Sequence, residues 1–408
     1  MKKTLAILGA IDRFNYGDLL FPILIEQALQ EVSSRYDFKY YGFRRSDLSR
    51  YGAKVTRSVR DLMQHPGLDA GDVILLAGGD VLGINWMPMH LHQLNSVQAR
   101  MFNSYFKIFG KGLRQGQRIN AGLAGRYGAG PFVLPWIPPK SAFKPGVRVV
   151  YNSVSGSLLH SLPPDYQIYI RDNLNAADFI SVRDSETRDQ LQKMGIDQPI
   201  RLVPDSAVIM SRYYPLDKLK TLVRPEILSW IESSADAYVC FQVKRSLGNK
   251  YVQDIVRELE ALSESLNMKI LLLPIGRVPM HEDHRILGEI QGRLGVPGFL
   301  PEDLTLFEMM YCIACSRLFA GTSLHGVVTA LSYAVPHLGV VQETPKLAAF
   351  LGDWGVDGLE RGIRLNEMSE KANQAIQMDK NKLSEKRESL LDLIEKHFKS
   401  LQNKILMD

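Results

Sequence analysis

Short apolar runs that end in Gly, Asn, Asp or Pro recur along this chain, and an amphipathic stretch follows each of them. Uninterrupted apolar runs are typical of strands buried on both faces, and their alternation with helices is typical of a parallel sheet. The sequence therefore predicts an α/β fold. In the first half of the chain the predicted strands are residues 5–10, 73–77, 147–151, 179–182 and 200–203.

This rhythm breaks between residues 211 and 235, where Tyr213, Tyr214, Pro215 and several charged residues gather. Apolar runs then resume at residues 237–243, 269–274, 298–300, 318–321 and 337–341. Because 408 residues exceed what one hydrophobic core usually serves, we predict two Rossmann-like domains, residues 1–215 and 235–365, and a helical tail, residues 366–408. Two parallel sheets in series suggest a GT-B-like architecture, with ligands in a cleft at the carboxyl ends of the strands.

Composition limits the function classes. The net charge of +5 suits anionic small molecules or an anionic membrane surface, and it is too dilute to indicate nucleic acid binding. The three cysteines form no disulfide framework, which favours a reducing compartment. The first apolar run leads straight into Asp12 and Arg13, so a buried strand explains it better than a signal peptide. We predict a cytoplasmic protein, with peripheral contact at the inner face of the membrane as a further option.

Two groups of metal-ligating residue types are interpreted as structural. Cys312 and Cys315 lie in an apolar run and lack a nearby second pair, so helix packing is favoured over zinc binding. His281 and His284 have a spacing that resembles metal ligands, but they stand in a polar stretch without apolar support. No Asp-x-Asp motif is present, and we expect neither a metal nor a cofactor.

Residues 85–145 have the least regular pattern and include an apolar, proline-rich segment at residues 131–139. Such a segment suits an acceptor-binding or membrane-touching loop. The favoured interpretation is a loop packed on its own domain.

Polar residues and glycines follow several of the predicted strands. Asn15, Gly17 and Asp18 come after the first, where Gly17 permits a tight turn and the helix N-terminus offers free N–H groups to an anion. Gly78 and Gly79 have the same role after another strand. Both motifs also fit ordinary helix capping and tight turns.

Arg183 and Asp205 each follow a later strand. The planar fork of an arginine suits a carboxylate or phosphate, and the alternative is an ion pair with Asp184 or with another strand. We interpret Asp205 as a helix cap rather than a base.

The most informative motif runs from Gly321 to Gly326 at a predicted strand–helix junction. Thr322 and Ser323 are good helix caps, and His325 stands at the helix start. A histidine held between glycines at such a junction is interpreted as functional. Further cations that end strands of the second domain are Lys244, Arg245 and Arg277.

In this order, the motifs resemble those of the polysaccharide pyruvyl transferase family. The matching pieces are Asn15–Asp18, Gly78-Gly79, Tyr151-Asn152-Ser153, Ser181–Asp184, Val203–Asp205, Gly321–Gly326 and Pro345-Lys346, and they span about residues 5–352. The resemblance implies a GT-B-like fold with phosphoenolpyruvate as donor and a hydroxyl pair of a glycan or lipid-linked sugar as acceptor. The product would be a pyruvate ketal. The N-terminal domain would be the acceptor side and the C-terminal domain the donor side.

By this resemblance His325 matches the active-site histidine, our candidate acid/base, and Arg183 matches an arginine that binds phosphoenolpyruvate. Lys346 would complete the anion clamp. The remaining candidate substrate-binding residues are Asn15, Gly17, Asp18, Gly79, Asn152, Ser153, Ser323 and Arg277.

The chain departs from the family at Ser323 and at Asp80, which replaces the third glycine of a run. Many members have an arginine two places before the histidine, where Ser323 stands. Either Arg277, Lys244 or Lys346 substitutes for it, or the donor site is altered.

Two other functions stay open at this point. One is a GT-B glycosyltransferase or nucleotide-sugar enzyme, for which Glu343 is the only well-placed carboxylate to bind a nucleotide ribose. The other is a non-catalytic family member that binds a glycan or a partner, a hypothesis that rests on Ser323.

Overall fold

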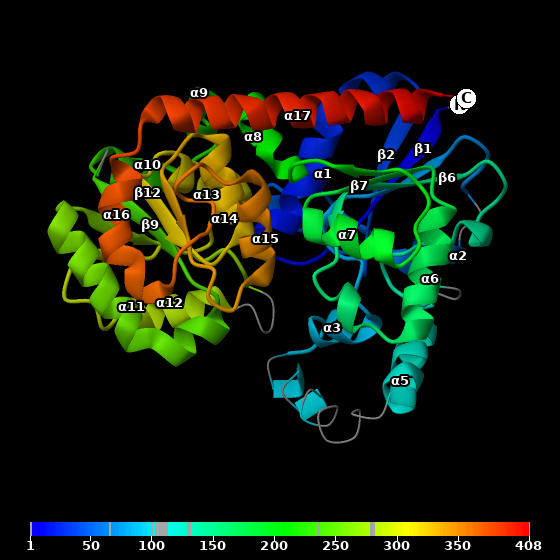
Figure 1. Cartoon of the computed structure of the whole chain (residues 1–408), viewed down its shortest axis with the longest axis horizontal. Coiled ribbons are helices and arrows are strands. Elements are labelled where there is room, and N and C mark those ends of the chain that lie inside the picture. The colour runs from blue at the N-terminus through cyan, green and yellow to red at the C-terminus, as the bar shows by residue number, and fades with distance from the viewer. Residues whose placement is uncertain are drawn as a thin grey trace.

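Two parallel β-sheets stand side by side in the computed structural model (Figure 1). The structure describes residues 2–64, 67–95, 97–99, 101–102, 104, 113–128, 132–234, 237–277 and 282–407. The N-terminal sheet has the order β3-β2-β1-β4-β6-β7-β8, and β5 pairs with β6. Its strands are β1 (Lys3–Leu8), β2 (Tyr36–Gly42), β3 (Arg57–Ser58), β4 (Val73–Leu76), β5 (Gly79–Asp80), β6 (Arg148–Ser155), β7 (Phe179–Val182) and β8 (Ile200–Leu202).

The C-terminal sheet has the order β11-β10-β9-β12-β13, and its strands also pair in parallel. They are β9 (Tyr238–Gln242), β10 (Lys269–Leu272), β11 (Gly298–Phe299), β12 (Leu318–Gly321) and β13 (His337–Gly339). Every residue of β9 and β12 is buried, because helices cover both faces of the sheet. The predicted α/β fold with two parallel-sheet domains is confirmed.

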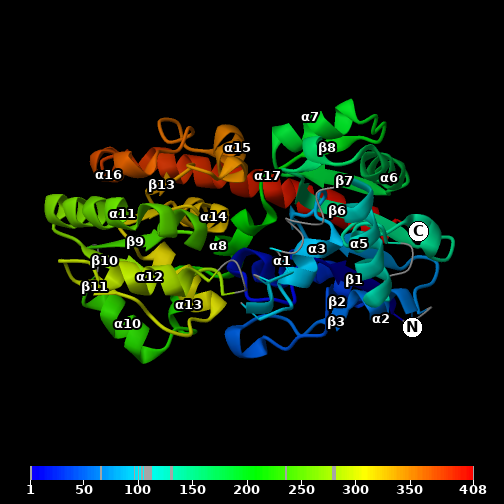
Figure 2. The same ribbon diagram turned by 90° about the horizontal axis from the view of Figure 1, so that it is seen from below.

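Helices alternate with the strands in both domains (Figure 2). In the first domain they are α1 (Tyr16–Ala28), α2 (Val59–Gln64), α3 (Trp86–Leu91), α5 (Leu113–Arg126), α6 (Pro164–Asn175) and α7 (Ser185–Lys193). The predicted connection between the domains is helical and contains α8 (Met210–Tyr213), α9 (Leu216–Lys220) and α10 (Pro225–Glu232). The second domain has α11 (Arg245–Leu266), α12 (Asp283–Gln291), α13 (Leu306–Ala314), α14 (Leu324–Ser332) and α15 (Pro345–Trp354), and α16 (Met368–Ile376) and α17 (Lys380–Leu406) form the tail.

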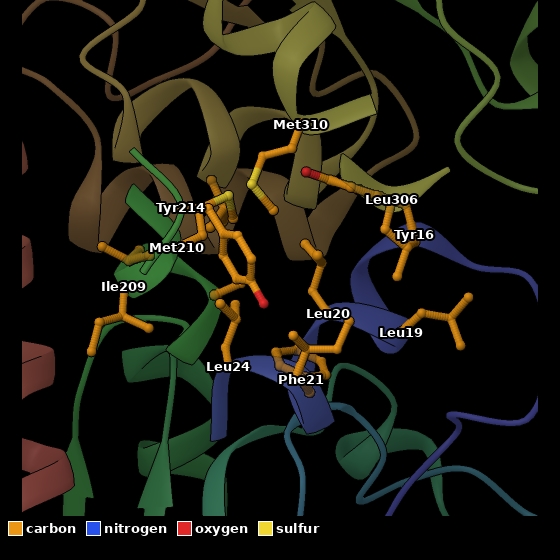
Figure 3. Packing of buried hydrophobic residues seen from close by; sticks show 14 of the residues in the cluster. Tyr16, Leu19, Leu20, Phe21, Leu24, Ile209, Met210, Tyr214, Leu306 and Met310 are labelled. Atoms are coloured by element: carbon orange, nitrogen blue, oxygen red, sulfur yellow. The ribbon is translucent and has the colours of Figure 1, made fainter. Parts of the chain in front are cut away.

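One apolar core continues from the first domain into the second. Helix α1 contributes Leu20 and Leu24, and Figure 3 shows them beside Met210 and Tyr214 from the connecting segment and Met310 from α13. Burial of apolar surface stabilises a fold by about 25 cal/mol per Å². A continuous core therefore holds the two sheets together as one body at this seam.

The tail helix α17 runs across both domains (Figure 1). Arg212, in the connecting helix α8, pairs with Glu388 and Glu395 of α17. Farther along α17, the Nε2 atom of His397 lies 2.8 Å from Oδ1 of Asn152 in β6. Arg148, at the start of β6, donates to the last carbonyls of the helix, including that of Ile405 at 2.9 Å. Helix α17 thereby ties the connecting segment to the N-terminal sheet.

In segment 85–145, Trp86 and the proline-rich stretch pack on their own domain where they are described. Trp86, Phe132 and Trp136 are buried in the core of the N-terminal sheet. Cys312 is buried within α13, as the helix-packing interpretation requires, whereas His281 lies outside the described residues. Among the helices that the structure describes, none has the length and apolarity needed to cross a membrane.

Candidate active site

The turn between β1 and α1 supplies the first part of the site. Asn15 is the N-cap residue of α1, but its side chain donates to Oδ2 of Asp18 at 2.8 Å instead of capping the backbone. The backbone of this turn also pairs with the second domain, since Asn15 forms a bridge with Gly276 and Tyr16 N–H donates to the carbonyl of Ile275 at 3.2 Å. The turn is thus fixed by both domains.

The turn between β12 and α14 supplies the second part. Ser323 is the N-cap residue of α14, and its hydroxyl accepts from Gly326 N–H at 3.1 Å. Helix α14 begins at Leu324, so His325 lies in its first turn. A Cβ on Gly326 would overlap the ring of Phe319, so only glycine fits between this helix and its strand.

These two helix starts face each other across the domain boundary. A Cβ on Gly17 would overlap the imidazole of His325, so the ring lies directly on the backbone of α1. Phe21 meets the same ring edge-on, with centroids 5.3 Å apart. Tyr16 and Thr329 share a hydrogen bond of 2.9 Å, and the Thr329 hydroxyl donates to the carbonyl of His325 at 2.7 Å. These contacts restrict both the place and the rotation of the imidazole.

A buried carboxylate joins the histidine to the predicted arginine. Oδ2 of Asp205 accepts from Nη1 of Arg183 at 2.8 Å, and the same oxygen lies 3.6 Å from Nε2 of His325. Arg183 and Asp205 are 2% and 0% exposed, whereas the histidine side chain is 13% exposed. Nε2 is buried without a hydrogen-bond partner in the described part of the chain. Of the three side chains, that of His325 is the most exposed.

The charges of the triad are mutually stabilised. Burial alone raises the pKa of the Asp205 carboxyl, but His325, Arg183 and the backbone N–H of Ala207 outweigh that effect and hold it well below its usual range. Asp205 is thus an anion at neutral pH. This anion lies 3.6 Å from Nε2 of His325.

Asp18 has the opposite balance. Burial raises the pKa of its carboxyl, and the nearby His325, Arg13, Lys346 and Arg183 offset that rise only in part. A carboxyl with increased proton affinity beside a histidine is a candidate base. The same interactions show that Lys346, on the first turn of α15, is close enough to act on this group.

Other predicted residues take structural positions. Asn152 is fully buried between His397, the carbonyl of Ala77 and the hydroxyl of Ser206. Ser153, with a left-handed φ of 50°, donates to the carbonyl of Pro204 at 2.9 Å. Both support the strand ends behind the triad. Gly79, with φ of 87°, lies against the side chain of Asp18.

The cations suggested as replacements at Ser323 differ in their contacts. Arg277 is paired with Asp303 and lies over the ring of Phe14, 5.1 Å from its centroid. Lys244 donates to the backbone carbonyl of Glu343, whose carboxylate pairs with Lys250 at 2.7 Å. Lys346 is exposed and forms no ion pair with any residue that the structure describes. It is the best placed of the three to bind a ligand anion.

The sequence did not reveal two features of the site. They are the contacts of Asp205 with both Arg183 and His325, and the buried position of Arg13. Asp205 is a cap, as interpreted, since it accepts from Ala207 N–H at 2.9 Å, but its second oxygen also joins Arg183 to His325. Arg13 is buried beside Asp12, and its Nη1 lies 2.8 Å from Nδ1 of His92. An Asp-Arg pair directly before the Asn15 motif was the available signal for Arg13.

The family model of polysaccharide pyruvyl transferase matches residues 15–343. The chain belongs to this family. The matched region of the pyruvyl transferase family begins at Asn15 and encloses Arg183, Asp205 and His325, whereas Lys346 lies just beyond it. No curated protein matches the chain.

Solved structures similar to this family member share its fold. S. aureus MnaA, in a co-structure with UDP, aligns with a TM-score of 0.56 at 13% identity over 100% of this chain and 99% of that one. A putative UDP-N-acetylglucosamine 2-epimerase from Listeria monocytogenes aligns with 0.55 at 12% identity, covering 100% and 98%. UDP-GlcNAc 2-epimerase from Neisseria meningitidis, bound to UDP-GlcNAc, aligns with 0.53 at 13% identity, covering 100% of both chains. At these identities the likeness is one of fold, and it confirms the predicted GT-B-like architecture.

Proposed function

We propose that the chain transfers the pyruvyl group of phosphoenolpyruvate to two hydroxyls of a sugar, forming a pyruvate ketal and releasing inorganic phosphate. Family membership supports the transferase class. The observation that carries the proposal is the oxygen Oδ2 of Asp205, which contacts both Arg183 and His325. It joins an anion-binding group and an acid/base group in one buried unit.

The donor carries a carboxylate and a phosphate, and both need cations. Arg183 is held at its strand end by Asp205, and Lys346 approaches from the N-terminus of α15. Charge-assisted hydrogen bonds are the strongest that such groups form. The N-terminus of α14, at Ser323 and His325, adds backbone N–H groups oriented toward an anion. We assign the donor to this end of the second domain.

Ketal formation requires two additions at C2 of the enol phosphate. In the first, an imidazolium at His325 gives its proton to the methylene carbon C3, and a sugar hydroxyl adds to C2 and releases its proton to Asp18. In the second, the C2–O bond to phosphate breaks, phosphate leaves with the electron pair, and the second hydroxyl adds to C2 and gives its proton to the imidazole of His325, which the first step left neutral. No oxidation or reduction occurs. The raised pKa of Asp18 suits the accepting group in the first step.

Asp205 has a supporting part in this scheme. It stabilises the imidazolium before the proton leaves and pairs with Arg183 in every state. Removing one partner of a buried pair leaves an uncompensated charge, which costs about 3–5 kcal/mol. Because Asp205 stays paired with Arg183, the arginine keeps its position when His325 gives up its proton.

The acceptor is a glycan or a lipid-linked sugar in this proposal. A lipid-linked acceptor would bring the enzyme to the inner face of the membrane, and the net charge of +5 suits that surface. Neither a metal nor a cofactor has a part in the scheme. Both expectations, and a cytoplasmic location, stay predictions.

Calorimetry tests the donor first. The unmodified protein is titrated with phosphoenolpyruvate and, separately, with UDP-GlcNAc. The proposal expects binding of phosphoenolpyruvate and release of inorganic phosphate only when a glycan acceptor is added. Binding of the nucleotide sugar alone would support a nucleotide-sugar enzyme, and binding of neither donor would support a non-catalytic glycan-binding member.

A further inference from the structure

Helix α15 crosses from the second domain to the turn that carries Arg183. Both views show α15 beside α7 (Figures 1 and 2). Its last two residues, Asp353 and Trp354, make the contacts. The indole Nε1 of Trp354 donates to the backbone carbonyl of Arg183 at 2.7 Å. The turn that presents the arginine is thus held by the opposite domain.

Asp353 binds Ser185, which lies two residues after Arg183. Its Oδ2 accepts from Ser185 N–H at 2.6 Å, and its Oδ1 accepts from the Ser185 hydroxyl at 2.7 Å. Ser185 is the first residue of α7, where backbone N–H groups have no partner within the helix. A carboxylate from the second domain satisfies one of them. Asp184 satisfies another from within the turn, by accepting from Thr187 N–H at 2.7 Å.

The other end of α15 carries Lys346. Trp354 lies eight positions after Lys346, which corresponds to about 12 Å along a helix axis. One short helix therefore holds one proposed arm of the anion clamp on its first turn and contacts the backbone of the other arm on its last. The separation of the two cations depends on how α15 is seated on α7.

We propose that Trp354 and Asp353 are positioning residues for Arg183. They do not touch the donor, and they set the place of the arginine backbone relative to Lys346. Asp205 fixes the far end of the same side chain at 2.8 Å, so the arginine is held at both ends, by its own domain at the guanidinium and by the second domain at the backbone. This inference rests on the proposed function, because it assumes that Arg183 binds the donor.

Trp354→Phe tests the proposal, because phenylalanine keeps an aromatic ring and loses the N–H donor. Loss of one hydrogen bond weakens binding by roughly 3- to 10-fold, and we expect the Kd for phosphoenolpyruvate to rise by that factor. Trp230→Phe is the matched control. Trp230 stacks on Phe299 with centroids 4.7 Å apart, and its indole nitrogen has no hydrogen-bond partner in the described part of the chain. That control should leave the Kd unchanged.

A second background separates positioning from general support. In Arg183→Lys, the lysine cannot reproduce the planar contact, so a residue that acts through Arg183 has little left to position. Adding Trp354→Phe there should change the Kd by less than about twofold, the coupling expected of residues that act through one another. An equal loss in both backgrounds would show a merely structural role and overturn the proposal.

Ser185→Ala tests the positioning role independently if Trp354→Phe unfolds the protein. It removes the hydroxyl donor and keeps the N–H bond to Asp353, and we expect a Kd increase of roughly twofold to fivefold. A folded Trp354→Phe or Ser185→Ala with an unchanged Kd would overturn the positioning role alone. Failure of the unmodified protein to bind phosphoenolpyruvate would instead overturn the proposed function, and this inference with it.

Discussion

The imidazole of His325 lies directly on the backbone of Gly17, which belongs to the other domain. Any side chain at position 17 would overlap the ring, and Phe21, one helical turn later, closes another side of it. The contact makes the place of the candidate acid/base a property of the domain boundary. Its consequences can be measured one residue at a time.

Gly17→Ala should reduce turnover while leaving the fold intact. Alanine favours a helix over glycine by about 1 kcal/mol, so α1 itself tolerates the change, but the added methyl must displace His325. We expect at least a roughly 10²-fold loss of kcat, the scale of misplacing a catalytic group. Gly288→Ala, in α12, is the control, since its Cβ would meet only ordinary contacts. Equal activity in the two variants would disprove the steric argument.

His325→Gln should cost on the order of 10²–10⁴ in kcat, because glutamine cannot donate a proton at neutral pH. The free energy of unfolding should change by less than about 1 kcal/mol, because glutamine fills much of the same space and brings no charge into the site. Steady-state kinetics and urea unfolding measure both quantities. His160→Gln, at an exposed position, serves as the comparison. If the fold is lost together with activity, His325 is structural.

Lys346→Ala should weaken phosphoenolpyruvate binding by roughly 1.5–3 kcal/mol, the range for a hydrogen bond to a charged group. Arg277→Ala should have little effect, because Arg277 is already paired with Asp303. Adding Ser323→Arg to Lys346→Ala should restore part of the affinity. It also removes the cap on Gly326, which costs about 1 kcal/mol of stability. Titration calorimetry on the variants decides which cation binds the donor, and a larger loss at Arg277 would reverse the assignment.

Stability should fall in acid because of His397. Burial, aided by Arg201, lowers the pKa of this histidine to about 4, whereas the unfolded chain binds the proton near the ordinary value. Between those values the unfolded state holds more protons, so stability is complete above pH 6.5 and declines as the pH falls toward 4. We expect a loss of roughly 2 kcal/mol between pH 7 and pH 5.

His397→Gln should remove that part of the pH dependence. Glutamine can still donate to Oδ1 of Asn152 but does not titrate. Urea unfolding at the two pH values measures the difference. A slope unchanged by the substitution would show that other groups cause the acid sensitivity.

The sequence predicted most strands because a strand buried on both faces is an uninterrupted apolar run. The runs at residues 179–182 and 318–321 coincide with β7 and β12. Strand β2 was missed, because Asp37 and Lys39 interrupt it and its middle residues are only partly buried. Local pattern carries little information about such a strand, whose pairing with β1 decides its structure.

The site was predictable to the extent that strand ends mark it. His325, Arg183 and Asp18 were recognised from local motifs, and they lie close together in the structure. The role of Asp205 in joining Arg183 to His325 was not recognised, because its contact with His325 spans 120 positions and is set by the packing of two domains. Asn152 was expected to bind substrate from the resemblance alone, and nothing in its own motif indicates that His397 lies against it.

The position of α17 bears on how the chain reaches its folded state. Leu390, Ile394 and Phe398 of this helix complete the apolar cluster to which both sheets contribute, yet they are synthesised after every strand. Contacts between residues so distant in sequence form slowly. Until α17 docks, the seam between the sheets exposes apolar surface, and such intermediates are prone to aggregate. Docking of α17 is therefore the event that covers this apolar surface and closes the seam between the two sheets.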